Sequence, residues 1–479
     1  MKTENSCKSN IFFMKRSLSV HLFLFLCFLL LSLQAQDIQK APEANELWKA
    51  GVARAVITPY ENMWMAGFSR RDKPAEGTLH DLWAKALVLE DAQGNRTLLI
   101  TTDILGFDRD LSLSICNRLI KEYHLERKNI ILSSSHTHSG PVINNKLSHV
   151  YPPFDEHQKE QVEEYRHFIK EQIIIVARRA VSNLAPARLS SGVGIARFAV
   201  NRRVHGWNNE VLYQPEMDGP SDHAVQVIRV SDPEDQPIAV LFGYACHPTN
   251  LRNYKWSGDY TGFAQIELEK AYPGFTAMFF AGFGADQNPF PREGIPQVIQ
   301  YGKELAIAVE NVMAEPMKVL TPSIQTSYEE IALDLSPPPT IEELAEALAE
   351  EDGWYKRWGE IMKEKLDSGY KFPDSYPYYP IQSWQLGEQT MVILGGEVVV
   401  DYSFILRKIL GNDLMLMAYA NDVMAYIPSE RILKEGGYEG EQSMWIYGHH
   451  GTWMPGIEEK IVNEVVRQVK LVRDGVLKN

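Results

Sequence analysis

The sequence is poor in cysteine, which argues against a small secreted domain held together by disulfides. It has four cysteines in 479 residues. Two of them lie in the first 35 residues, and Cys116 and Cys246 are the two that follow. A single bond between Cys116 and Cys246 is the most that they can form. The disulfide framework of a small secreted domain is therefore excluded.

Long apolar runs are also scarce, and the one that stands out lies near the start of the chain. Residues 22–33 are almost wholly apolar, Lys15 and Arg16 precede them, and Leu33-Gln34-Ala35 is a plausible cleavage site. The run is shorter than the roughly 20 residues that span a bilayer. We interpret residues 1–35 as a cleaved signal peptide, with a membrane anchor as the alternative. We therefore expect export to a bacterial periplasm or secretion, with no membrane span after cleavage.

Clusters of basic residues are absent, and the net charge is −14. Removal of residues 1–35 takes away four basic residues and one acidic residue, so the net charge becomes −17. An acidic surface of this kind argues against binding nucleic acid or anionic lipid. The remaining chain, residues 36–479, is long enough for a large core and is interpreted as one catalytic domain. Nothing in the sequence indicates an oligomeric state.

Strands and helices alternate along the chain. Apolar alternation predicts strands at 83–90, 97–103, 187–193, 224–230 and 276–281, and helical spacing predicts helices at 109–123, 155–184, 296–313 and 456–471. This order predicts an α/β fold, with a mixed β-sheet core flanked by helices. Residues 201–203 are expected in a loop.

A proline run interrupts this order after the first two thirds of the chain. Ser336 is followed by three prolines, and Thr340 with Glu343 forms a capping box for an acidic helix to about Leu366. The Tyr- and Pro-rich stretch 370–379 is expected to be a loop. We interpret residues 336–380 as a linker-like insertion.

Two histidines follow the apolar segment 129–132 and are separated by one threonine. In extended backbone, residues two apart point to the same side, so His136 and His138 can face one pocket. Imidazole is a common zinc ligand, and a catalytic zinc site keeps one position for water. The pattern therefore indicates a metal site, although a hydrogen-bonded core histidine is the alternative for each.

Other polar groups also follow predicted strands: His247, the run Asp286-Gln287-Asn288, Glu397 and Tyr426. In α/β sheets, functional groups gather beyond the carboxyl ends of strands. His136, His247 and Glu397 are a plausible zinc ligand set. Glu397 follows two glycines, so capping a turn is the alternative for it.

Five motifs, in the same order, resemble those of the neutral/alkaline ceramidase family. Residues 129–141 (NIILSSSHTHSGP) resemble the family's strand followed by T-H-T-H-S-G-P. The other four are GVARAVITP with WMAGF, ACHPTNL with SGDYTGFA, GGEVVV, and AYIPSE with GGYEG. The resemblance covers most of the chain after residue 35.

The resemblance implies a role for each matching residue. It implies a zinc ion held by His136, His247, Glu397 and Tyr426. His138 would then stand beside the metal as acid and base, Arg202 would face the substrate, and Tyr438 would polarise the scissile carbonyl. The implied function is a zinc-dependent amidohydrolase in which water on zinc attacks an N-acyl amide, ceramide-like in the family.

The sequence departs from the family pattern in three places. Gln287 stands where the family has a serine regarded as catalytic. A glutamine cannot be a nucleophile, but it can donate a hydrogen bond to an oxyanion. The family's carboxy-terminal immunoglobulin-like domain is not expected here, and residues 336–380 have no counterpart. A zinc hydrolase acting on a polar glycan or peptide derivative, and a non-catalytic lipid- or glycan-binding homologue, are the alternatives.

Overall fold

The structure is a computed structural model that describes residues 47–476 except 144–148 and 209. The chain divides after Glu46, and Leu47–Asn479 forms one unit that includes residues 336–380. The proposed signal peptide lies outside the described residues and stays a prediction. Within them, no helix combines the length and the apolar character needed to cross a bilayer.

A large mixed sheet forms the centre of the molecule, in the order β12-β10-β9-β6-β1-β3-β4-β5, with β14 paired to β6. Its strands are β1 (Trp48–Val56), β3 (Trp83–Glu90), β4 (Arg96–Thr102), β5 (Ile130–Ser134), β6 (Ala185–Ile195), β9 (Ala224–Ser231), β10 (Pro237–Tyr244), β12 (Thr276–Ala281) and β14 (Lys318–Leu320). The outer pairs β4–β5 and β10–β12 are parallel, and the pairs between them are antiparallel. The predicted mixed sheet is confirmed.

A second sheet packs against one face of the first. It consists of β15 (Ile324–Asp334), β16 (Ser375–Leu386), β17 (Gln389–Leu394) and β19 (Leu414–Met417). One buried cluster contains Ile131 and Met278 of the large sheet together with Met391 and Met417 of the small one. On β17 the alternate residue Val392 belongs to a different cluster, on the outer face. Both faces of β17 and β19 are therefore buried, which explains their nearly continuous apolar sequences.

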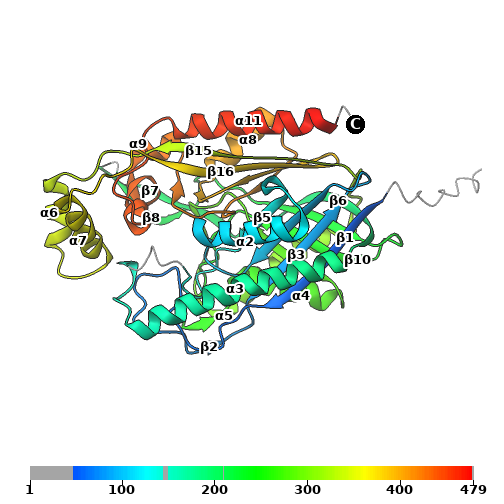
Figure 1. Cartoon of the computed structure of the whole chain (residues 1–479), viewed down its shortest axis with the longest axis horizontal. Helices are drawn as coiled ribbons and strands as arrows, with labels where there is room; N and C mark the ends of the chain where they lie inside the picture. The colour runs from blue at the N-terminus through cyan, green and yellow to red at the C-terminus, as the bar shows by residue number, and fades with distance from the viewer. Residues whose placement is uncertain (1–46, 144–148, 209, 477–479) are drawn as a thin grey trace, which may run out of the picture. The chain divides into compact units, whose positions relative to one another are not determined.

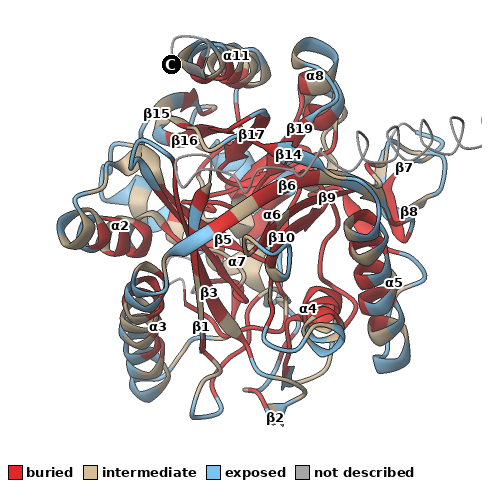
Figure 2. Cartoon of the chain, turned by 90° about the vertical axis from the view of Figure 1, so that its right-hand side faces the viewer, coloured by how far each residue is buried: buried red, intermediate tan, exposed pale blue. Residues whose placement is uncertain are grey.

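Helices cover the two outer faces, so the molecule has four layers (Figures 1 and 2). The large sheet is covered by α2 (Arg109–Tyr123), α3 (Glu156–Ser182), α4 (Asp259–Ala271) and α5 (Ile295–Ala314), and the small sheet by α8 (Asp401–Leu410) and α11 (Ile457–Val476). The long helix α3 begins with a capping box between Asp155 and Gln158. It buries a stripe at helical spacing that includes Ile169, Ile173 and Ala177.

Shorter elements carry or surround the site. They are β2 (Gly77–Thr78), β7 (Ala199–His205), β8 (Val211–Glu216), β11 (Lys255–Trp256), β13 (Gln287–Pro289), β18 (Glu397–Val398), β20 (Tyr426–Ile427), α6 (Ile341–Ala349), α7 (Trp354–Asp367), α9 (Glu430–Glu435), a π-helical turn at Tyr438–Gln442 and α10 (Ser443–Ile446). The helices α6 and α7 lie at one end of the molecule (Figure 1).

Three predictions about local structure were wrong. Residues 201–203 lie in strand β7, not in a loop, because two buried arginines there are held by ion pairs and hide the usual apolar alternation. The acidic helix is two helices, α6 and α7, with Gly353 at φ +123° between them. The last five residues of the expected loop 370–379 begin strand β16, which pairs with β15.

The two cysteines of the described residues do not form a disulfide. Cys116 and Cys246 are both free and buried. Cys116 belongs to the cluster between α2, α3 and the large sheet, whereas Cys246 belongs to a different cluster that includes α4 and α5. Each thiol packs as a small apolar side chain.

Candidate metal centre

Four side chains that are distant in sequence meet where strands of the two sheets end. His136 follows β5, and His247 follows β10. Glu397 and Tyr426 begin β18 and β20, which pair in parallel with these two residues directly opposite each other. The structure thus brings together the four residues predicted as ligands.

The donor atoms of these side chains are in close contact. Oε2 of Glu397 lies 3.0 Å from Nε2 of His247 and 3.2 Å from Nε2 of His136. The hydroxyl of Tyr426 lies 3.3 Å from Nε2 of His247. Nε2 of His138 lies 3.3 Å from Nε2 of His136, and one ring nitrogen from each of the three histidines fits within 4.8 Å of the others. Such a convergence of nitrogen and oxygen donors fits a metal ion.

The outer nitrogens of two histidines are fixed by backbone carbonyls. Nδ1 of His136 lies 2.6 Å from the carbonyl oxygen of Leu105, and Nδ1 of His247 lies 3.2 Å from that of Gly284. A hydrogen on each Nδ1 would satisfy these carbonyls and leave the lone pair of Nε2 facing the centre. This arrangement is typical of metal-binding histidines.

His136 has a left-handed backbone conformation, with φ +62°. That conformation is uncommon for a residue with a side chain and marks a strained position. The strand before it is held by Asn421, which donates its backbone N–H to the carbonyl of Leu132 at 2.7 Å. The imidazole of His136 packs on the ring of Tyr419, with centroids 4.3 Å apart. These contacts keep the ring directed at the centre.

The charges of the centre suit a cation. Burial raises the pKa of Glu397, but His136 and His247 outweigh it and hold this pKa well below its usual range, so the carboxylate is ionised. Burial and the nearby Arg202 lower the pKa of His247 to about 4. Burial, together with the other two histidines, lowers the pKa of His138 well below its usual value. A carboxylate beside neutral imidazoles is the protonation state that metal ligands need.

His138 faces both the centre and the open cavity, since it is the partly exposed member of the three histidines. Its ring packs on Phe68, with centroids 4.8 Å apart, and on Gly67, where a Cβ would lie 2.4 Å from the ring. Its Nδ1 has no hydrogen-bond partner among the described residues. The geometry therefore brings both histidines of the sequence motif to the centre, and the distinction between ligand and catalytic neighbour stays a prediction.

Arg202 connects the centre to the cavity. It is 2% exposed, and its Nη2 donates to the hydroxyl of Tyr426 at 3.1 Å. Its Nε donates to Glu439 at 2.7 Å, and the guanidinium lies 4.7 Å from the ring centre of Tyr213. The ring of Tyr438 lies 5.3 Å from that of Tyr426 and also lines the cavity. Both residues therefore line the cavity beside the centre, and their roles toward a substrate stay predictions.

Gln287 is not brought to the cavity. Its side chain is fully buried: Oε1 accepts the backbone N–H of Asp222 at 2.7 Å, and Nε2 donates to the carbonyl of Ala245. Its own carbonyl accepts the N–H of His247 at 3.0 Å. The oxygen and the nitrogen of the side-chain amide are thus both hydrogen-bonded to backbone groups. In this structure Gln287 positions the segment that carries His247, and its buried side chain is not among the residues that line the cavity.

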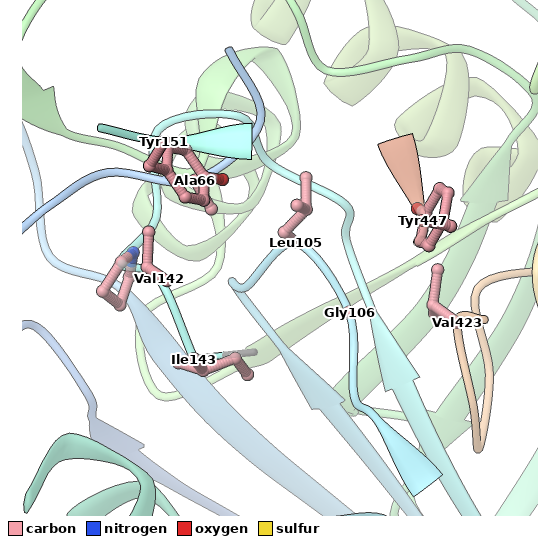
Figure 3. Close-up of a pocket in the computed structure, with 9 residues that line it drawn as sticks. Ala66, Leu105, Gly106, Val142, Ile143, Tyr151, Val423 and Tyr447 are labelled. Atoms are coloured by element: carbon pink, nitrogen blue, oxygen red, sulfur yellow. The ribbon is translucent and has the colours of Figure 1, made fainter. Parts of the chain in front are cut away.

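A cavity of about 550 Å³ opens beside the centre. His138, His247, Tyr426, Tyr438 and Arg202 form its floor, and aromatic and arginine side chains form its walls. A smaller pocket with mostly apolar walls is lined in part by Tyr447 (Figure 3), whose hydroxyl donates to Glu397. It is lined by Ala66, Leu105, Gly106, Pro141, Val142, Ile143, Tyr151, Val423 and Tyr447.

Sequence reasoning missed two residues that support the centre. Tyr447 donates to Glu397, and no motif in the sequence marks it. Glu439 accepts from Arg202 and Arg203 at 2.7 and 2.6 Å. Its position next to Tyr438 in the GGYEG motif was a usable signal.

Comparison with curated proteins finds relatives that are described as neutral ceramidases. The chain is 28% identical over 265 residues to the neutral ceramidase of Pseudomonas aeruginosa, covering 52% of this chain and 38% of that protein. It is 26% identical over 233 residues to the neutral ceramidase of Drosophila melanogaster, covering 47% and 32%. These alignments span about a third of the length of the relatives.

Solved structures share the fold. A structure titled "Ceramidase complexed with C2" superposes with a TM-score of 0.69 at 17% identity, covering 90% of this chain and 76% of that one. The crystal structure of Pseudomonas aeruginosa neutral ceramidase gives a TM-score of 0.69 at 20% identity, with 90% and 75% covered. The family model for the N-terminal part of neutral/alkaline non-lysosomal ceramidase matches residues 48–288. The chain therefore belongs to the neutral/alkaline non-lysosomal ceramidase family.

Proposed function

We propose that this protein is an exported, zinc-dependent amidohydrolase that cleaves the N-acyl amide of a ceramide-like lipid. Family membership supports amide hydrolysis, because the curated relatives are described as neutral ceramidases. Export rests on the signal-peptide pattern of residues 1–35.

One observation carries the zinc assignment: an ionised Glu397 lies between two histidines whose Nδ1 atoms are fixed by carbonyls. Imidazole nitrogen and carboxylate oxygen are ligands that zinc accepts readily, and the open cavity leaves room for water and substrate. The phenol of Tyr426 is the fourth proposed ligand. The residues present therefore fit the ion.

A zinc ion bound there would make a water molecule acidic near neutral pH and would polarise a carbonyl. The side chains around it have distinct parts in the reaction. Nε2 of His138 can accept a proton and release it to the nitrogen of the leaving amine. Tyr438 and Arg202 both line the cavity, and in this proposal their hydroxyl and guanidinium would stabilise the charge that develops on the scissile carbonyl oxygen.

The decisive experiment pairs metal analysis with a substrate panel. Purified protein should contain about one zinc ion per chain and release fatty acid from ceramide or a related N-acyl amide, and Glu397→Ala should do neither. His167 lies exposed on α3, so His167→Ala is a matched histidine control that should keep both properties. Zinc that persists in the double variant His136→Ala/His247→Ala would contradict the proposed centre. Full zinc without release from any amide would favour a non-catalytic binding protein.

A further inference from the structure

The walls of the cavity are rich in arginine. Among the described residues, five arginines and no aspartate or glutamate line it: Arg70, Arg71, Arg202, Arg252 and Arg292. The chain as a whole carries a net charge of −14. The cavity is therefore a positive region in an acidic protein, which concentrates anions at the metal centre.

Three of these arginines have no ion pair within the described part of the chain. Arg202 pairs with Glu439, and Arg252 pairs with Glu293 at 3.2 Å. Arg70, Arg71 and Arg292 make no ion pair with a described carboxylate. The excess positive charge of the cavity thus rests on these three.

Arg71 is the buried member of the three, with 4% of its surface exposed. It donates to the carbonyls of Ala66 and His138, the latter at 2.7 Å, and its Nε has no partner among the described residues. Burial lowers the pKa of Arg71 to about 10, so the side chain stays charged at neutral pH. A buried charge without a counter-ion costs stability, and a bound anion would offset part of that cost.

Arg70 and Arg292 are the accessible members. Arg70 is exposed, and Arg292 is half-buried and also lines an adjoining pocket with Arg202 and Tyr213. Over a longer distance Arg292 lowers the pKa of the buried Asp259. Guanidinium groups bind carboxylates and phosphates through paired hydrogen bonds, so these two side chains are suited to contact an anion directly.

The same cavity also has apolar walls, formed by Phe68, Val150, Trp354 and Ile446. An acyl chain can pack on these side chains, whereas the arginines need a charged group. The two kinds of surface therefore fit the two halves of an amide: an apolar acyl chain and a charged amine part.

We propose that the substrate carries an anionic group, such as a carboxylate, sulfonate or phosphate, on its amine side, and that Arg292 and Arg70 bind this group. This inference rests on the proposed amide hydrolysis. Arg71 adds positive charge beside the backbone of His138.

A matched pair of substrates tests the proposal. N-dodecanoylglycine and N-dodecanoylethanolamine share the acyl chain and differ in carrying a carboxylate or a hydroxymethyl group. The zinc-loaded protein should cleave the first with a kcat/KM about tenfold higher or more, mainly through KM, and the ratio should fall as salt is added. Arg292→Gln and Arg70→Gln should each bring the ratio closer to one.

Two controls separate this effect from general damage. Arg229→Gln removes an arginine that pairs with Asp235 away from the cavity, so it should keep the wild-type ratio. A third substrate with a carboxylate at the far end of the acyl chain should show no such preference. A ratio of one in the wild type, or a ratio that survives both cavity variants, would overturn the proposal.

If the protein cleaves neither substrate, this result would count against amide hydrolysis. The anion site could then still be tested by binding alone. The same two compounds would then be titrated into zinc-loaded protein by calorimetry. Tighter binding of the glycine derivative that Arg292→Gln abolishes would support the anion site. Equal binding of the two compounds would refute it.

Discussion

The phenol of Tyr447 donates a 2.5 Å hydrogen bond to Oε1 of Glu397, whereas Oε2 of the same carboxylate faces His136 and His247. One oxygen of Glu397 thus faces the two histidines of the centre, and the other accepts the hydrogen bond from Tyr447. Such outer contacts keep a ligand in one orientation before the metal binds.

Tyr447→Phe should therefore weaken zinc binding by about 10- to 100-fold, which is the usual effect of losing such a contact. Competition with a chromogenic chelator measures it. Tyr123 donates to Glu122 at 3.0 Å on the surface of α2, so Tyr123→Phe is a matched control that should leave zinc affinity unchanged. Equal affinity in the two variants would show that Tyr447 does not orient the ligand.

Glu439 neutralises two buried arginines at once. Glu439→Gln leaves Arg202 and Arg203 without that charge in a buried site, so we expect a loss of about 3–5 kcal/mol in the free energy of unfolding. Urea unfolding of the metal-free protein measures this loss. Glu156 forms an exposed pair with Lys159, and Glu156→Gln should cost less than about 1 kcal/mol. Similar losses in both variants would contradict the argument.

Gly67 permits the close approach of His138. Gly67→Ala would place a Cβ 2.4 Å from the imidazole, and the displaced ring should lower kcat/KM by about 100-fold. Gly94 has a similar positive φ, +84° against +96°, but open space around it, so Gly94→Ala has the backbone strain without the clash. Only the first variant should lose activity, although both should lose some stability. Equal activity in the two would show that the ring tolerates displacement.

Asp259 should make stability depend on pH. Burial raises the pKa of Asp259 from 3.8 to about 6, so the folded protein binds this proton more tightly than the unfolded chain does. The stabilising contribution is fully present below pH 3.8 and is lost as the pH rises through about 6, a change of about 3 kcal/mol.

The difference in unfolding free energy between wild type and Asp259→Asn isolates this contribution, because other carboxylates titrate in both proteins. From pH 4 to pH 7 the wild type should lose stability relative to the variant. A difference that stays constant over this range would mean that the pKa of Asp259 is not raised.

The sequence predicted those features that depend on local pattern. Strands β3 and β12 and helix α2 match their expected bounds, because each has a regular apolar repeat and clear ends. His136, His247 and Glu397 were found because each follows an apolar strand. Tyr426 was noted because it follows a predicted strand, but its role as a ligand came only from the resemblance. Tyr438 was found only through the resemblance, since a tyrosine among apolar residues has no distinguishing pattern.

The features that the sequence analysis missed depend on residues that lie far away along the chain. Strand β7 was missed because Arg202 and Arg203 are buried by Glu439, more than 230 residues away along the chain. Tyr447 was missed because its role appears only when it reaches Glu397, 50 residues before it. Gln287 was assigned by its place in a motif, whereas its two backbone partners, Asp222 and Ala245, come from other segments.

The four proposed ligands come from segments that lie far apart along the chain. The region matched by the family model ends at residue 288, before Glu397 and Tyr426. A fragment limited to that region would carry His136 and His247 without the carboxylate that lies between them. If the proposed centre binds its metal, stoichiometric uptake would signal that β18 and β20 have joined the rest of the fold, and it would report complete folding.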